Sequence, residues 1–292
     1  MTEYSNPQIP EGINVSSEHP LKEFATMALA VGLMMMVIIL LLSFAAQYVV
    51  RYVPFSVEQN LTKNINQLDI DQAFIGDEQV LDQSHKQSIE SYLQTLANQL
   101  IASRKAPYPV IVHYIESDQV NAFATLGGHL FFTRALLEKM PDENTLAMVM
   151  GHEIAHISHR DPMVALGRGL TLAIAAASVF GAGDGVLAQS LVGQANLLTQ
   201  LNFSRGAEMD ADQEALNTLM DHYGHLHGAD TLFTLLRESR EGEEPFKWFS
   251  THPLTEDRLR AVAEFSAHDS GQHKNPRPTP LPAFITALKK SQ

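Results

Sequence analysis

The longest feature of the hydrophobic pattern is an uncharged, apolar run at residues 24–50, which follows a polar and acidic segment at residues 1–23. A helix of that length is long enough to cross the roughly 30 Å hydrocarbon core of a membrane. The run is longer than the core of a typical signal peptide, and the segment before it is not basic. The pattern therefore predicts a flexible N-terminal tail followed by one transmembrane anchor in the lipid bilayer.

Basic residues flank the anchor almost evenly. Lys22 lies before it, while Arg51 and Lys63 lie after it. The positive-inside rule compares the basic residues close to the two ends of a span, and here the two sides barely differ. The side of the membrane that holds the remainder of the chain stays open on this evidence.

Residues 51–80 have mixed polarity and are interpreted as a juxtamembrane connector. Residues 81–103 then predict an amphipathic helix. Its apolar residues recur at helical spacing: Ile89, Leu93, Leu96, Leu100 and Ile101. After a break at Pro107 and Pro109, the segment Val110–Ile115 is rich in β-branched residues and predicts a strand.

Two short apolar runs within Val120–Thr133 are separated by Gly127-Gly128. This arrangement predicts a β-hairpin or a bulged pair of strands. A strand edge beside an active site pairs with an extended peptide through main-chain hydrogen bonds. The candidates for contact with a substrate strand are Asn121, Ala122, Phe123, Gly128 and the run His129–Thr133. A purely structural hairpin is the alternative.

A second apolar stretch, Leu166–Phe180, contains Arg168 and ends in the glycine-rich break Gly181–Gly185. A charge in the middle of a membrane span is costly. The stretch is therefore interpreted as part of a helical hairpin that packs on the soluble domain or dips into the membrane surface. The polar residues 266–292 form a C-terminal tail to which the pattern assigns no function.

The composition narrows the chemistry that the chain supports. It has 292 residues, no cysteine and a formal net charge of −13. Without cysteine, neither a disulfide nor a thiolate metal site can form, so a metal would be held by histidine and carboxylate. The negative charge and the lack of a basic stripe argue against a nucleic-acid partner.

The strongest candidate for catalytic chemistry is the segment Gly151–Asp161, which reads GHEIAHISHRD. On a helix, His152 and His156 lie one turn apart and can direct two imidazole nitrogens at one point, with Glu153 beside them. Two nitrogen ligands and an adjacent carboxylate suit a metal site with a general base. The chain has 13 histidines, so a chance match to this pattern is the alternative.

The residues around this motif argue against chance. Asp142 is a suitable N-cap just after Pro141, so a helix start is specified. The helix that follows is apolar nearly all round and is therefore expected to be buried. A buried glutamate and two buried histidines are costly without partners, and a metal ion is one such partner.

The acidic helix predicted within Asn202–Met220 offers a third ligand. Glu208 and Asp212 lie four residues apart on one face, where like charges repel unless a cation lies nearby. We expect Glu208 to be the third ligand and Asp212 to accept a hydrogen bond from a ligand histidine, His152 in the first place. Taken alone, this acidic run would be interpreted as a solvated helix face.

Together these motifs resemble the M48 family of zinc metallopeptidases. Four segments carry the resemblance, which covers roughly Leu81–Phe265: NAFA with GGHLFFT, GHEIAHISHRDP, SRGAEMDAD and THPLTEDRL. It implies a mixed α+β fold, mainly α, with a gluzincin-like metallopeptidase domain and a small β-sheet at residues 81–265. The ligand positions of the family fall on His152, His156 and Glu208, with the aspartate that follows on Asp212.

The resemblance also bears on the membrane and on the C-terminal motif. A single N-terminal span resembles the Oma1-like and periplasmic branches rather than the four-span HtpX arrangement. This favours a bacterial-type inner (cytoplasmic) membrane, with the catalytic domain expected on the periplasmic side. By the same resemblance His252 is a candidate catalytic residue that hydrogen-bonds the oxyanion, or else a structural turn residue, and Arg258 is a candidate to steady the acidic cluster.

The resulting hypothesis is a membrane-anchored endopeptidase with one Zn²⁺ per chain, which cleaves polypeptides such as misfolded or envelope proteins. In it, Glu153 is the general base toward a zinc-activated water. The alternative from another class is a metal-stabilised membrane adaptor or chaperone that does not cleave. A third possibility is a latent protease plugged by a loop or by residues 266–292. The sequence does not indicate an oligomeric state.

Overall fold

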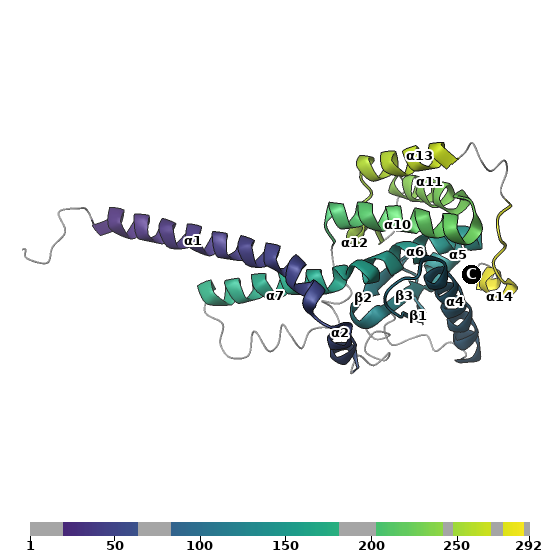
Figure 1. Cartoon of the computed structure of the whole chain (residues 1–292), viewed down its shortest axis with the longest axis horizontal. Coiled ribbons are helices and arrows are strands. Elements are labelled where there is room, and N and C mark those ends of the chain that lie inside the picture. The colour runs from purple at the N-terminus through teal and green to yellow at the C-terminus, as the bar shows by residue number, and fades with distance from the viewer. Residues whose placement is uncertain (1–19, 64–82, 181–202, 242–247, 270–276, 289–292) are drawn as a thin grey trace, which may run out of the picture.

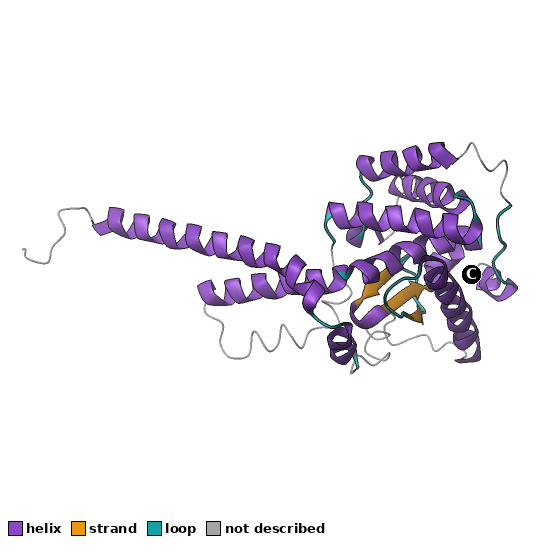
Figure 2. Cartoon of the chain, in the orientation of Figure 1, coloured by secondary structure: helices purple, strands orange, loops and turns teal. Residues whose placement is uncertain are grey.

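A computed structural model describes residues 20–63, 83–180, 203–241, 248–269 and 277–288. Figure 2 shows a mainly helical chain with one small sheet, which confirms the mixed, mainly helical fold class that the sequence predicts. Most of the predicted N-terminal tail, the later part of the connector and the break at Gly181–Gly185 lie outside the described residues.

The helices, in chain order, are α1 Pro20–Val49, η1 Val50–Tyr52, α2 Phe55–Thr62, α4 Gln83–Arg104, η2 Leu126–Gly128, α5 Arg134–Lys139, α6 Glu143–His159, α7 Asp161–Phe180, α10 Arg205–Tyr223, α11 His227–Glu241, α12 Trp248–Thr251, α13 Glu256–Asp269 and α14 Ala283–Leu288. The strands are β1 Ile111–Ile115, β2 Ala122–Thr125 and β3 His129–Thr133. The predicted strand, hairpin and motif-bearing helices therefore form close to where the pattern places them.

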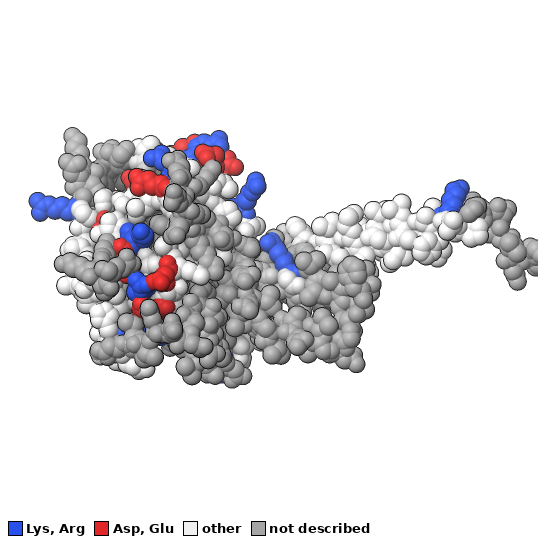
Figure 3. Space-filling view, turned by 180° about the vertical axis from the view of Figure 1, so that it is seen from behind, with Lys and Arg blue, Asp and Glu red and all other residues white. Residues whose placement is uncertain are grey.

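Helix α1 projects from the folded domain as a stem, and α7 lies beside it (Figure 1). Within the described part of the chain, one helix is long and apolar enough to cross a membrane, at Pro20–Leu42, where the mean hydropathy is 2.7 and nothing is buried. The stem shows no charged side chain over most of its length in the back view (Figure 3). The first half of the predicted hairpin, α7, thus packs mainly along α1 rather than on the body of the domain.

The sheet has the order β1-β3-β2, with β1 parallel and β2 antiparallel to the central strand β3. The hairpin turn between β2 and β3 contains Gly127 and Gly128, which have positive φ angles of 73° and 86°. This conformation is accessible to glycine at little cost. Because β3 is paired on both sides, β2 is the strand of the hairpin with a free edge, that is, an edge without a partner strand among the residues described.

Helix α6 is the centre of the domain and is buried along almost its whole length, as predicted. Its start is fixed by Asp142, whose carboxylate accepts a hydrogen bond of 2.8 Å from the backbone N–H of Thr145. On one side lie α4 and the sheet, and on the other α10 and α11 (Figure 1). Helix α10 packs closely on α6 at Gly151, where a Cβ would lie 3.4 Å from Ala215 Cα, in ordinary van der Waals contact.

Helices α10 and α13 and the loop between α12 and α13 bring the C-terminal motif onto α6. Ser204 caps α10 by accepting a hydrogen bond of 3.2 Å from Ala207 N. Thr255 caps α13 by accepting a hydrogen bond of 3.3 Å from Arg258 N. The loop before Thr255 carries His252 and presents it to α6 and α10.

Candidate metal centre

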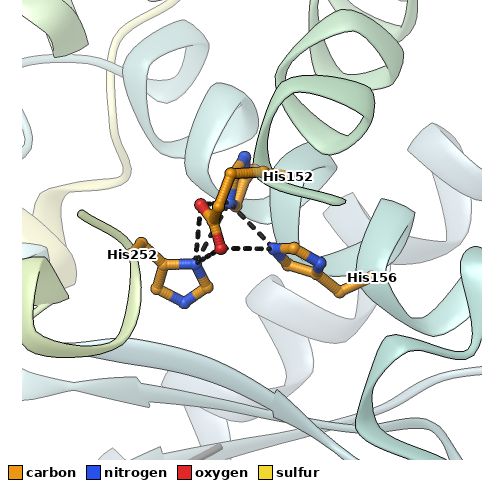
Figure 4. Close-up of side chains that lie close together, drawn as sticks. His152, His156 and His252 are labelled. Carbon is orange, nitrogen blue, oxygen red and sulfur yellow. Dashed lines mark hydrogen bonds and ion pairs between the residues drawn. The ribbon is translucent and has the colours of Figure 1, made fainter. Parts of the chain in front are cut away.

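Three elements converge on one buried point beside the middle of α6. His152 and His156 come from α6 and His252 from the loop after α12 (Figure 4). Glu208 comes from the first turn of α10. All four side chains are buried, and one donor atom of each lies within 4.8 Å of the donor atoms of the others. The structure therefore brings together the three predicted ligands and adds His252 to them.

The spacing of these donor atoms fits a tetrahedral metal ion. Ligand atoms at the usual zinc bond length of 2.0–2.1 Å from a tetrahedral centre lie roughly 3.3–3.4 Å apart. The Nε2 atoms of His152 and His156 are 3.1 Å apart, and carboxylate oxygens of Glu208 lie 3.4 and 3.6 Å from them. His252 Nδ1 lies 3.3 Å from His152 Nε2 and 3.0 Å from Glu208 Oε1. The donor set and its spacing thus suit zinc.

Behind the donors, Asp212 and Arg258 form a buried layer. Asp212 Oδ1, the acceptor that the sequence predicts, lies 3.0 Å from Nδ1 of His152, which is an ion-pair distance, although the pair does not have the geometry of a hydrogen bond. Arg258 donates to both carboxylate oxygens of Asp212, at 2.6 and 2.8 Å, and lies 2.9 Å from Glu208 Oε2. The guanidinium therefore neutralises part of the acidic charge and fixes both carboxylates.

The electrostatics of the cluster favour the protonation states that a metal requires of Glu208 and His156. Burial and the neighbouring His152 lower the pKa of His156 well below its usual range, so its ring is neutral. Burial opposes ionisation of Glu208, but His252 and His152 outweigh it and hold the pKa of Glu208 well below its usual range. Burial likewise lowers the pKa of His152, but Asp212 and Glu208 raise it to about 9. Metal binding would release that proton.

Glu153 lies next to the donor cluster without belonging to it. Its Oε1 accepts a hydrogen bond of 3.2 Å from Trp248 Nε1 and lies 3.5 Å from His252 Nε2. Its Oε2 is buried and has no hydrogen-bond partner among the residues described. A buried carboxylate oxygen without a partner is costly and is available to a water molecule or a substrate proton.

Sequence reasoning missed two residues that contact His156. Asp161 Oδ2 lies 2.8 Å from His156 Nδ1, and the Phe203 ring lies 4.1 Å from the imidazole. Asp161 stands five residues after His156, beyond the end of α6, so helix geometry gave no signal for it. Both residues line a cavity of about 610 Å³ between α7 and α10. His159 lies outside the donor cluster and pairs with Glu214 at 3.2 Å.

The candidate substrate strand is placed beside the same centre. Trp248, whose indole contacts Glu153, donates its backbone N–H to Val120 O at 3.3 Å, just before β2. Asn121, Ala122 and Phe123 are buried in or next to β2, on the strand with the free edge, whereas Gly128 lies in the buried turn. A Cβ at Gly128 would lie 2.3 Å from Pro109 O, which explains the glycine by packing.

Comparisons with known proteins identify a family and several relatives that this chain resembles. The model of peptidase family M48 matches residues 83–266. The beta-barrel assembly-enhancing protease of Yersinia pestis is 28% identical over 202 residues, which cover 65% of this chain and 40% of that protein. The mitochondrial metalloendopeptidase OMA1 of Schizosaccharomyces pombe is 28% identical over 158 residues, 53% of this chain and 46% of that one. A protease HtpX homolog of Salinibacter ruber is 27% identical over 213 residues, 60% and 74% of the two chains.

The chain spans about two fifths of the length of the beta-barrel assembly-enhancing proteases that it matches. The family match itself is broader in this chain, since it covers more than half of the 292 residues and includes all four donor residues. The resemblance carried by the sequence motifs is thereby confirmed. The chain belongs to peptidase family M48.

Proposed function

We propose that the chain is a membrane-anchored zinc endopeptidase in which His152, His156 and Glu208 hold the metal and Glu153 is the general base. One observation carries the proposal: the buried Glu153 has a carboxylate oxygen with no partner in the described segments, beside a donor set with the spacing of a zinc site. A scaffold or adaptor requires the metal ligands but has no need of such a base.

Bound zinc would polarise a scissile carbonyl and lower the pKa of water. Glu153 takes a proton from the attacking water and delivers it to the departing amine nitrogen. Trp248 donates to Oε1 of Glu153 and so orients the carboxylate, which leaves Oε2 for the proton. Asp212 and Asp161 each hold the Nδ1 side of one histidine, so that both Nε2 atoms point to the donor cluster.

A substrate segment would bind in extended form along the free edge of β2, next to Asn121, Ala122 and Phe123. Two observations support this placement: β3 is paired on both sides, and the Asn121 Oδ1 atom is buried with no partner in the described part of the chain. The apolar stem α1 supports an enzyme anchored in a membrane. From the family resemblance we propose an inner membrane, with the periplasmic side preferred, and membrane or envelope polypeptides as substrates.

The experiment is degradation of unfolded casein by the full chain in detergent, with bound zinc quantified in every sample. The Glu153→Gln variant is expected to keep one zinc per chain and to lose at least about 100-fold in kcat, the usual contribution of a general base. Glu143→Gln is the matched control, because Glu143 lies on the same helix and bonds Tyr92 and Tyr223 instead. Loss of zinc from E153Q, or equal turnover in E153Q and wild type, contradicts the assignment.

The position of His252 favours a second candidate, the latent form of the same enzyme. A metal ion held by all four donors would have His252 Nδ1 at its fourth corner, and no corner would be open to water until that ring moved. A latent enzyme therefore predicts that His252→Ala raises casein cleavage, because it opens the fourth corner. The role that we prefer for His252 is to donate a hydrogen bond to the oxyanion after its ring has moved. This role predicts instead that His252→Ala lowers kcat while the metal content stays unchanged.

A further inference from the structure

The segment that follows the stem meets the end of the metal-binding helix. It consists of η1 and α2, Val50–Tyr52 and Phe55–Thr62, and it precedes residues 83–266, to which the family match is confined. Nevertheless it contributes a buried carboxylate to the domain, Glu58, which is 3% exposed. Its partner is Arg160, which is 5% exposed and directly follows α6.

The Arg160 side chain binds this segment at three points. Its Nε donates to Glu58 Oε1 at 2.7 Å, and its Nη1 donates to Val50 O at 2.8 Å and to Val53 O. The guanidinium carbon also lies 6.0 Å from the centre of the Phe55 ring, within the range of a cation–π contact. Arg160 therefore fastens the end of the stem to the end of α6.

The backbone of Arg160 is the joint between α6 and α7. It has φ 62° and ψ 30°, the left-handed conformation, and its N–H bonds to the carbonyls of His156 and Ile157. Its own carbonyl accepts from Met163 N and Val164 N at 3.1 Å in the first turn of α7. A residue other than glycine rarely adopts this conformation unless its surroundings hold it there. The three side-chain contacts supply that restraint.

Glu58 extends the connection to the sheet. Its second oxygen, Oε2, accepts a hydrogen bond of 3.2 Å from Gly127 N in the turn between β2 and β3. Thr62 packs on the same glycine, where a Cβ would lie 2.3 Å from Thr62 Oγ1. One buried carboxylate thus bonds both the joint after the metal-binding helix and the turn of the hairpin that carries the free edge.

A single residue, Asp161, connects the joint at Arg160 to the donor cluster. Asp161 follows Arg160, and its Oδ2 lies 2.8 Å from Nδ1 of His156. The partner on Nδ1 sets the orientation of a ligand histidine, so a displaced joint would turn the His156 ring. A rigid joint therefore keeps the His156 donor atom in place.

We propose that Glu58 and Arg160 are positioning residues. Together they fix the positions of α6 and of the hairpin turn relative to the end of the stem. Retention of zinc and turnover both depend on this pair, although neither residue touches the donor cluster. The inference rests on the proposed function, because it assumes that His156 is a metal ligand.

A purely structural role is the competing explanation, since removing one partner of a buried ion pair destabilises a protein in any location. Arg160→Gly separates the two roles. Glycine adopts the left-handed conformation freely, so the backbone of the joint keeps its conformation while the side-chain contacts with Glu58 and the stem are lost. Lys105→Gly is the backbone control, because Lys105 also has a positive φ, 53°, at the end of α4. Glu138→Gln is the ion-pair control, because it removes a carboxylate partner of Arg134 in α5.

The experiment uses the full chain in detergent, loaded with one zinc, at a temperature well below every melting midpoint. The rate of zinc loss to a chelator, kcat and KM for casein, and Tm are measured for wild type, R160G, Glu58→Gln and both controls. We expect R160G and E58Q to lose zinc about tenfold faster than wild type and to have a kcat about tenfold lower. These changes are in the range known for the loss of residues that orient metal ligands. The controls are expected to match wild type in zinc loss and kcat, whatever their Tm.

Two results overturn the inference. One is that R160G and E58Q lower Tm but keep the zinc-loss rate and kcat of wild type. The other is that E138Q reproduces their losses, which would make stability alone the cause. If R160G does not fold, E58Q decides, because it removes the charge of the carboxylate and leaves Arg160 in place. A wild-type zinc-loss rate in E58Q then rejects positioning. A wild type without zinc or cleavage would instead reject the proposed function.

Discussion

Nδ1 of His152 lies 3.0 Å from Oδ1 of Asp212, while Nε2 of the same ring points into the donor cluster. The two residues are 60 positions apart in the chain and meet because α10 packs closely on α6 at Gly151. Asp212 thereby fixes which nitrogen of His152 faces the metal and how the ring is turned.

Asp212→Asn is expected to weaken zinc affinity by about 10–100-fold, because an amide is a poorer partner for the His152 N–H and for Arg258. Competition with a chromogenic chelator measures this affinity. Asp210→Asn is the matched control, since Asp210 lies on the same helix but is exposed. Equal zinc affinity in the two variants would show that the contact with Asp212 does not support the metal.

Arg258→Ala is expected to destabilise the fold by about 3–5 kcal/mol, the usual cost of leaving a buried charge without its partner. Arg258 is 1% exposed and bonds the carboxylates of both Asp212 and Glu208. Urea unfolding measures the change. Arg260→Ala on the same helix removes an exposed ion pair with Asp257 and should change the free energy of unfolding by less than about 0.5 kcal/mol. Similar losses in the two variants would contradict the buried role of Arg258.

Removal of the metal is expected to lower the melting temperature, because zinc binds the folded donor cluster and the unfolded chain presents no such cluster. Free zinc at 100 times its dissociation constant stabilises a fold by about 2.7 kcal/mol. Thermal unfolding with and without a chelator measures this difference. His156→Ala should have the same melting temperature in both conditions. A persistent chelator effect in that variant would place the responsible metal elsewhere in the chain.

The free energy of unfolding is expected to fall as the pH drops from about 6.5 to about 4, in part because of His113. Burial, with the charges of His129 and Lys86, lowers the pKa of His113 from 6.5 to about 4. Between these values the unfolded chain binds the proton and the folded chain does not, so acid favours unfolding. The contribution is intact above pH 6.5 and is lost on the way down, with a slope of at most about 1.4 kcal/mol per pH unit.

Urea unfolding at several pH values between 4 and 7.5 measures this slope. His113→Gln removes the titrating group and retains a polar side chain opposite His129, which lies 2.8 Å away in the wild type. The variant should therefore show a shallower dependence on pH over this range. An unchanged slope would assign the acid sensitivity to other groups.

The sequence alone determined the elements that depend on local pattern. The helix that carries His152 and His156 follows from the N-cap at Asp142 and the apolar residues after it, and the hairpin follows from the two glycines at its turn. The spacing of HExxH on a helix fixes two donor atoms within one element, and no tertiary contact is needed for that step. The apolar stem is similarly a matter of length and composition.

Tertiary structure decided everything that joins distant elements. Packing of α10 and the loop after α12 on α6 brought Glu208 and His252 to the two histidines, and only this packing put His252 Nδ1 among the other donor atoms. Helix periodicity ends at His159, so it held no information on Asp161 or on the Arg160 clamp with Glu58, which lies 102 positions earlier. Such contacts depend on where whole elements settle when they bury their apolar faces, and no local pattern in the chain encodes that placement.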